Sequence, residues 1–113
     1  MLLQQLNDEI AAMVAGARRG LVQITNGGRG SGAGTIWHPD GLIITNAHVI
    51  AGRHTLKVTL PDKRTLPAEV IAADPERDIA ALYVAASDLP TVALGDPRRL
   101  RPGDWVLTVG HPW

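Results

Sequence analysis

One histidine and one aspartate are the residues of this chain best placed for chemistry. His48 lies in the run Thr45-Asn46-Ala47-His48-Val49, directly after an apolar strand-like segment. Asp78 opens a second apolar run, Asp78-Ile79-Ala80-Ala81-Leu82, about 30 residues later. An imidazole held beside a carboxylate is the pair that activates a hydroxyl nucleophile in a Ser-His-Asp triad. The spacing therefore indicates two of the three members of such a triad, one at each of two strand ends.

The third member, a nucleophilic serine, is not evident. The sequence contains no Gly-x-Ser-Gly-Gly or Gly-x-Ser-x-Gly stretch, which would supply the serine together with its oxyanion-binding backbone. Ser87 lies among turn-forming residues, and Ser31 lies in a glycine-rich strand entry whose hairpin register runs towards His48. The glycines around Ser31 are better explained by close backbone packing, so we predict that neither serine is a nucleophile.

The acidic partner of His48 has two candidates. Asp74 precedes Pro75 and has the character of a turn residue. Asp78 instead opens an apolar strand, where a carboxylate needs a partner such as an imidazole N–H. We therefore favour Asp78. Thr45 and Asn46 are expected to support the backbone around His48.

The elements that must position these residues are mostly short strands. Apolar residues at helical spacing predict an amphipathic helix over residues 2–17 that covers one end of a barrel. After Gly20 the pattern changes to short apolar runs separated by Gly, Pro and Asp, which is typical of all-β barrels and sandwiches. We predict seven strands, over residues 21–25, 32–37, 42–45, 54–60, 66–73, 79–84 and 105–109.

A connector separates the sixth predicted strand from the seventh. Pro, Gly, Asp and Ser interrupt the strand pattern from residue 85 to residue 104. This divides the chain into an N-terminal helix (1–20), a β-barrel (21–86), a connector (87–104) and a further strand segment (105–113). The last predicted strand has no later partner, which leaves an exposed edge.

These motifs, in this order, resemble the trypsin-like serine proteases of the HtrA (Deg) family over nearly the whole chain. The resemblance is carried by Gly30-Ser31-Gly32-Ala33-Gly34, the histidine motif Leu42–Val49, the aspartate motif Asp78–Leu82, and the stretch from Leu94-Gly95-Asp96 to Gly110-His111-Pro112. Val49 stands where disulfide-rich digestive trypsins usually have cysteine, which favours the bacterial-type branch.

The resemblance implies a fold and a division of roles. The fold would be all-β, a six-stranded antiparallel barrel with an N-terminal helix, followed by the first strand of a missing second barrel. His48 would be the general base and Asp78 the carboxylate that orients it, with the serine and the oxyanion hole in the missing part. Family members cleave unfolded or damaged proteins, and many are homo-oligomers of the bacterial cell envelope or periplasm.

Composition excludes several other function classes. Lysine plus arginine equals aspartate plus glutamate at 11 each, so no net field favours nucleic acid or an anionic membrane. The chain has no cysteine, and His38, His54 and His111 show no ligand spacing, so we predict no metal and no cofactor. No apolar run is long enough to predict a membrane-spanning helix.

Two functions fit this sequence. The first is the N-terminal part of a serine endopeptidase, inactive alone because the nucleophile is absent, with a polypeptide substrate and the missing barrel as its partners. The second is a non-catalytic barrel module that pairs with another chain through its exposed strand edge. Labelling by an active-site serine probe would distinguish the two functions.

Overall fold

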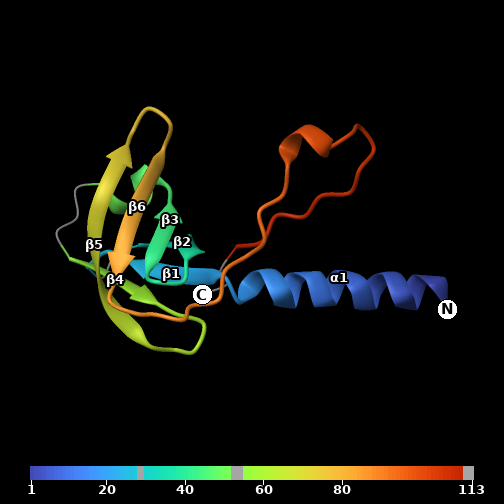
Figure 1. Cartoon of the computed structure of the whole chain (residues 1–113), viewed down its shortest axis with the longest axis horizontal. Helices are drawn as coiled ribbons and strands as arrows, with labels where there is room; N and C mark the ends of the chain where they lie inside the picture. The colour runs from blue at the N-terminus through green and yellow to red at the C-terminus, as the bar shows by residue number, and fades with distance from the viewer. Residues whose placement is uncertain (28–29, 52–54, 111–113) are drawn as a thin grey trace.

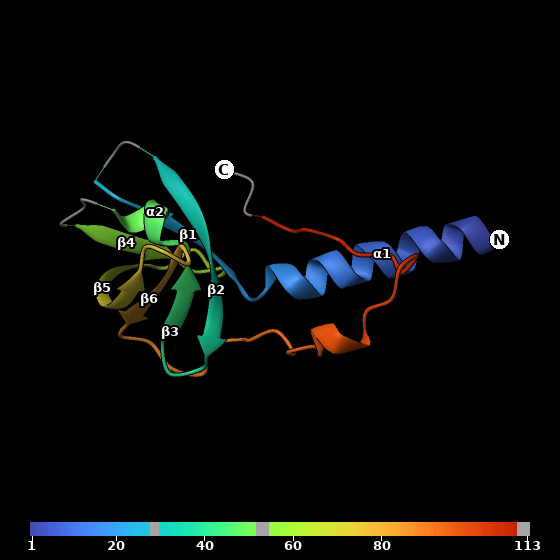
Figure 2. The same ribbon diagram turned by 90° about the horizontal axis from the view of Figure 1, so that it is seen from above.

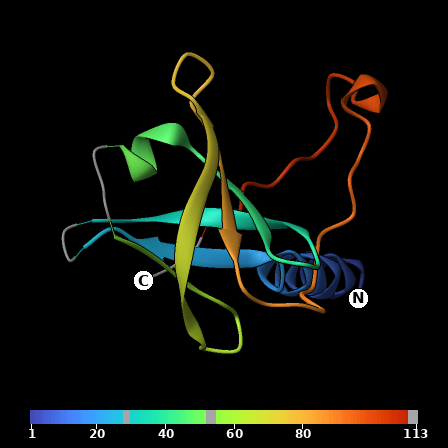
Figure 3. The same ribbon diagram turned by 60° about the vertical axis from the view of Figure 1, so that its left-hand side comes forward.

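Six antiparallel strands form a closed barrel. The computed structural model describes residues 1–27, 30–51 and 55–110. Within these residues the strands follow the order β1-β2-β3-β6-β5-β4, and β4 pairs back to β1 (Figures 1 and 3). This confirms the predicted barrel with an N-terminal helix. The elements are α1 (Leu2–Arg18), β1 (Leu21–Thr25), β2 (Ser31–His38), β3 (Leu42–Thr45), α2 (Ala47–Ile50), β4 (Leu56–Thr59), β5 (Thr65–Asp74), β6 (Ile79–Val84) and the 3₁₀ helix η1 (Pro97–Arg99).

The barrel interior is filled by apolar side chains that alternate with outward-facing residues. Along β1 and β2 every second residue is buried, as the two-residue period of a strand requires. Bulky branched side chains therefore pack in a single core, and the most completely buried are Val22, Ile24, Ile36, Ile43, Val58, Leu82 and Val84. Because these side chains fill the barrel interior, a functional site is expected at the rim of the barrel and not inside it.

The turn between β2 and β3 depends on Gly41. Its backbone has φ +109°, and its carbonyl oxygen accepts a hydrogen bond from the backbone N–H of Val84 at 3.0 Å. A Cβ at this position would lie 2.1 Å from the Val84 carbonyl oxygen. Because only glycine fits both conditions, the turn at residues 38–41 holds the β2–β3 hairpin against β6.

The helix α1 does not cover a barrel end, so that prediction is wrong. It extends away from the barrel (Figures 1 and 2). No residue of α1 is buried. Its apolar side chains Leu6, Ile10 and Met13 instead line a hollow of about 190 Å³ together with Trp105 and Leu107. The apolar side chains of α1 face Trp105 and Leu107 and not the barrel core, which is already filled by side chains of the six strands.

The predicted strand over residues 105–109 is also not present. Residues 105–110 form no ladder with any described strand. A strand exists only where a neighbouring backbone accepts and donates its hydrogen bonds, and the six barrel strands are already paired on both sides. Trp105 is accordingly 95% exposed. The predicted strand start at His54 and the last residues 111–113 lie outside the described residues.

No helix among the described residues is long and apolar enough to cross a membrane.

Candidate active site

The pairing of β3 with β6 brings the two predicted site residues together. Thr45, at the end of β3, is the register partner of Ala80 near the start of β6. His48 follows Thr45 in the short helix α2, and Asp78 immediately precedes β6. Two segments 30 residues apart in the chain therefore meet at one rim of the barrel, as the sequence predicted.

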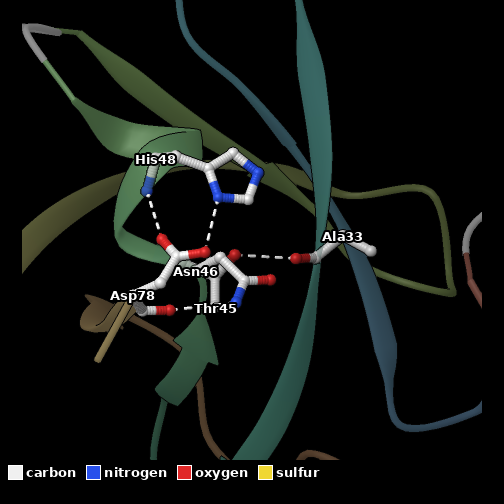
Figure 4. A network of polar contacts seen from close by, with 5 residues as sticks. All are labelled: Ala33, Thr45, Asn46, His48 and Asp78. Atoms are coloured by element: carbon white, nitrogen blue, oxygen red, sulfur yellow. Dashed lines mark hydrogen bonds and ion pairs between the residues drawn. The ribbon is translucent and has the colours of Figure 1, made fainter. Parts of the chain in front are cut away.

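Asp78 contacts His48 through both of its carboxylate oxygens (Figure 4). The ring Nδ1 of His48 lies 2.7 Å from Oδ2 of Asp78. The backbone N–H of His48 donates to the other oxygen, Oδ1, at 2.8 Å. These two hydrogen bonds fix the imidazole relative to its own backbone. The second ring nitrogen, Nε2, points away from the carboxylate.

Thr45 and Asn46 support this pair from the preceding residues. The Asn46 side chain donates from Nδ2 to the backbone carbonyl oxygen of Asp78 at 2.9 Å. The buried hydroxyl of Thr45 donates to the Ala33 carbonyl oxygen at 2.7 Å, which ties the end of β3 to β2. Both residues therefore have the supporting place that the sequence suggested.

The backbone at Asp78 has an uncommon conformation. Asp78 has φ +55°, in the left-handed region, and its N–H bonds to the carbonyl oxygen of Pro75. Aspartate tolerates this region better than most residues, and such positions are concentrated at functional sites. The competing candidate Asp74 instead bonds to Arg77 with an Oδ2–Nη1 distance of 2.8 Å. Asp74 is the last residue of β5 and not a turn residue as predicted, and its carboxylate bonds to Arg77 of the turn that follows.

The surroundings of Asp78 favour its ionised form. The pKa of the Asp78 carboxyl is held below its ordinary value, chiefly by the hydrogen bond from the backbone N–H of His48. The bond from the His48 side chain, charge attraction and the backbone N–H of Ala47 lower this pKa further, while partial burial opposes them. An ionised carboxylate accepts a proton-bearing Nδ1, which leaves Nε2 as the basic nitrogen of the neutral ring.

His48 borders an open, mostly apolar hollow. The hollow has a volume of about 480 Å³. The imidazole is 72% exposed, so its free nitrogen is accessible from solvent. The side chains that line the hollow come from α2, β5 and the β5–β6 turn: Ala47, His48, Ile50, Ala51, Val70, Ala73, Pro75 and Asp78. Nothing in the sequence indicates that Val70 and Ala73 line this hollow, because their place depends on which face of β5 they lie on.

Ser31 is not brought to His48. Its register partner is Thr25 of β1. The β2–β3 ladder pairs Thr35 with Ile44 but does not continue to Ser31, because the chain leaves β3 at Thr45 and turns into α2. No hydrogen bond joins Ser31 to His48 in the part of the chain that the structure describes.

The described residues contain no group of three or more His, Cys, Asp or Glu side chains that could hold a metal ion. His38 bonds to Asp40 within its own turn, whereas His54 and His111 lie outside the described residues.

Comparison with known proteins identifies the family. The sequence profile of the family described as "Trypsin-like peptidase domain" matches residues 32–113, a stretch that includes both His48 and Asp78. The chain belongs to this trypsin-like peptidase family. The matched region begins in β2, so α1 and β1 precede it.

The relatives of this family member are serine proteases of the HtrA (DegP-like) type. The chain is 43% identical over 84 residues to the "Putative serine protease HhoB" of Synechocystis, covering 74% of this chain and 20% of that protein. It is 46% identical over 85 residues to a "Probable periplasmic serine endoprotease DegP-like" of Halomonas elongata, covering 75% of this chain and 18% of that protein.

A solved structure shares the same fold. The serine endoprotease from Yersinia pestis superposes with a TM-score of 0.74 at 30% sequence identity, covering 80% of this chain and 35% of that one. The chain therefore spans about a fifth of the length of the curated relatives and about a third of the similar solved chain.

Proposed function

We propose that this chain supplies the general base and its orienting carboxylate to a serine endopeptidase. His48 is the base and Asp78 holds it. The observation that carries the proposal is the double contact from Asp78 to the Nδ1 and the backbone N–H of His48, at 2.7 and 2.8 Å. This contact leaves Nε2 of the exposed imidazole directed away from the carboxylate, where a hydroxyl can reach it.

The geometry supports acyl transfer through Nε2. As a serine oxygen attacks the peptide carbonyl carbon, Nε2 of His48 takes the hydroxyl proton and the imidazolium is stabilised by Asp78. Nε2 then gives this proton to the leaving amine when the peptide C–N bond breaks. Water hydrolyses the acyl-enzyme by the same steps, and His48 ends in its starting state.

The nucleophile is proposed to come from the remainder of the peptidase domain. The sequence contains two serines, Ser31 and Ser87, and neither lies in a nucleophile motif. The chain covers 35% of the similar endoprotease chain, so most of that fold has no counterpart in it. An apolar surface formed by α1 together with Trp105, Val106 and Leu107 is available to contact the missing barrel.

The proposed substrate is a polypeptide in an extended form. The hollow beside His48 is lined largely by the small or apolar side chains Ala47, Ile50, Val70, Ala73 and Pro75. Such a surface suits an apolar side chain of a peptide, which a folded protein keeps in its core. The relatives named endoproteases support a protein substrate for the complete domain.

Hydrolysis of a fluorescent casein tests the proposal. The 113-residue chain alone is expected to show no turnover, because it lacks both the nucleophile and the oxyanion-binding N–H groups. In a longer product that includes the serine, His48→Ala is expected to lower kcat by about a thousandfold or more. Ser31→Ala in the same longer product is the matched control and should leave kcat unchanged. His48-independent cleavage by the longer product, or labelling of Ser31 by a fluorophosphonate, would contradict the proposal.

A non-catalytic module that pairs through a strand edge is less well supported. Each of the six barrel strands already has a neighbour on both sides. Residues 105–110, which were expected to provide the edge, form no strand in the described structure.

A further inference from the structure

The helix that carries His48 is too short to hold its own orientation. α2 consists of the four residues Ala47–Ile50, and its N-cap residue Asn46 makes no side-chain capping bond. A helix of one turn is unstable without outside contacts, because nucleation costs more than a single hydrogen bond returns. Buried Ala47 and Ile50 anchor one side of α2 in the barrel core. The other side carries His48 and Val49, so contacts there must set the rotation of the helix.

Asn26 holds the backbone of α2 from the end of β1. Its side-chain Nδ2 donates to the carbonyl oxygen of Val49 at 3.0 Å. Carbonyl groups in the last turn of a helix have no partner within the helix, so this bond satisfies a group that would otherwise need water. Only a donor fits against a carbonyl oxygen, which assigns the amide nitrogen to this contact. Asn26 therefore holds the residue directly after His48.

Gly32 holds the side chain of the same residue from β2. A Cβ built on Gly32 would lie 2.6 and 2.7 Å from the two Cγ atoms of Val49. The backbone of Gly32 has an ordinary conformation, so glycine is required here for space and not for φ. The Val49 side chain therefore seats directly on the backbone of β2. Together, Asn26 and Gly32 fix Val49 through its carbonyl group and its side chain.

We propose that Asn26 and Gly32 are positioning residues for the general base. By fixing Val49, they set the rotation of α2 at which Nδ1 and the backbone N–H of His48 both meet Asp78. The role of His48 as a base rests on the proposed function, whereas the dependence of the His48–Asp78 contact on Val49 does not. Neither residue is expected to touch the reacting atoms.

The tautomer of the His48 ring reports this contact without any need for hydrolysis. The carboxylate of Asp78 stabilises the proton on Nδ1, whereas a free imidazole prefers the other tautomer. Long-range ¹H–¹⁵N NMR spectra of the full chain, at a pH where the ring is neutral, distinguish the two forms. We expect the Nδ1–H form to predominate in the wild type, and to be lost as the major form in Asn26→Asp, which keeps the shape of the side chain but removes the donor.

Gly32→Ala tests the second contact, with a compensating change and a matched control. Gly32→Ala should also lose the Nδ1–H form, and the double variant Gly32→Ala/Val49→Ala should recover it, because the two Cγ atoms in conflict are gone. Gly34→Ala is the control on the same strand. Its Cβ would crowd Ile43, Ile24 and Val22 but not α2, so it should destabilise the barrel while the tautomer stays unchanged.

Three results would overturn the proposal. They are an unchanged tautomer in both Asn26→Asp and folded Gly32→Ala, no recovery in the double variant, or an equal loss of the Nδ1–H form in Gly34→Ala. The last would mean that the tautomer follows general stability. If His48→Ala keeps full peptidase activity in the longer product, the proposed function fails while the tautomer results still decide the positioning role.

Discussion

His48 and Asp78 are joined twice, once through the ring Nδ1 and once through the backbone N–H, at 2.7 and 2.8 Å. A single ring contact would leave the imidazole free to follow any rotation of α2. With the backbone also held, rotating the helix breaks one bond or the other. Both bonds therefore form together only at one rotation of the helix, so the tautomer of the ring depends on that rotation.

This double contact predicts a pH-dependent contribution of Asp78 to stability. Because the folded-state pKa of Asp78 is below its unfolded value of about 3.9, its contribution is complete above that value and is lost as the pH falls through the folded pKa. Urea unfolding of wild type and Asp78→Asn between pH 5 and pH 2 should show a difference in free energy that shrinks with acid. Asp62 and Asp96, whose pKa values are also lowered, contribute equally to both proteins and cancel.

The matched control for this measurement is Asp74→Asn. Asp74 lies four residues upstream and pairs with exposed Arg77 instead of His48. An exposed ion pair contributes little to stability, so we expect this variant to follow the wild type. A difference between wild type and Asp78→Asn that stays constant from pH 5 to pH 2 would mean that the carboxylate is not held by His48 in solution.

The conformation of the β2–β3 turn, at the other end of β3 from His48, predicts a large effect of Gly41→Ala. An alanine there must adopt φ +109° and its Cβ would lie 2.1 Å from the Val84 carbonyl oxygen. We expect a loss of about 2 kcal/mol or more in the free energy of unfolding. Gly27→Ala is the control, since Gly27 has φ +83° with no atom within 4 Å of the added Cβ, and should cost about 1 kcal/mol. Equal losses in the two variants would show that the clash with Val84 is relieved.

The sequence predicted the barrel well because its strands are short apolar runs bounded by turn residues. The six barrel strands and the pairing of His48 with Asp78 follow from local pattern and from the ordered motifs. Local pattern cannot tell what a helix packs against. The stripe of Leu6, Ile10 and Met13 predicted α1, but its neighbours Trp105 and Leu107 come from a segment about 95 residues away.

The contacts that fix Val49 were also beyond sequence reasoning. A glycine in a strand indicates a bulge or a close approach, but not which side chain approaches it. Asparagine is common in turns, so Asn26 alone indicates only a turn. Its bond to the Val49 carbonyl oxygen joins residues 23 positions apart, which local pattern does not reveal. The prediction of a strand over residues 105–109 was wrong for a related reason. An apolar run shows that a segment is able to pair, but it does not show that a partner strand lies beside it.

The exposed course of α1 predicts that the barrel is stable without it. Deleting residues 2–16 removes no buried side chain and no strand contact. We expect Tm, followed by circular dichroism, to change by less than about 4 °C. Leu82→Ala, which empties a fully buried core position, is the positive control and should cost about 2–5 kcal/mol. If the deletion lowers Tm as much as the core variant does, α1 packs on the barrel in solution.

The close approach of β2 to α2 predicts that a disulfide can replace the Gly32–Val49 contact. A Cβ on Gly32 would lie 3.2 Å from Cβ of Val49, a few tenths of an ångström below the usual range of about 3.5–4.5 Å. Because the chain has no cysteine, Gly32→Cys/Val49→Cys offers one possible intramolecular bond.

Oxidation of this double variant should consume both thiols and raise the free energy of unfolding by about 2–3 kcal/mol, while the Nδ1–H tautomer of His48 is kept. Gly27→Cys/Val49→Cys, whose first position has no atom within 4 Å of its Cβ, should stay reduced under the same conditions. Free thiols in folded, oxidant-treated Gly32→Cys/Val49→Cys would show that α2 does not rest on β2 as described.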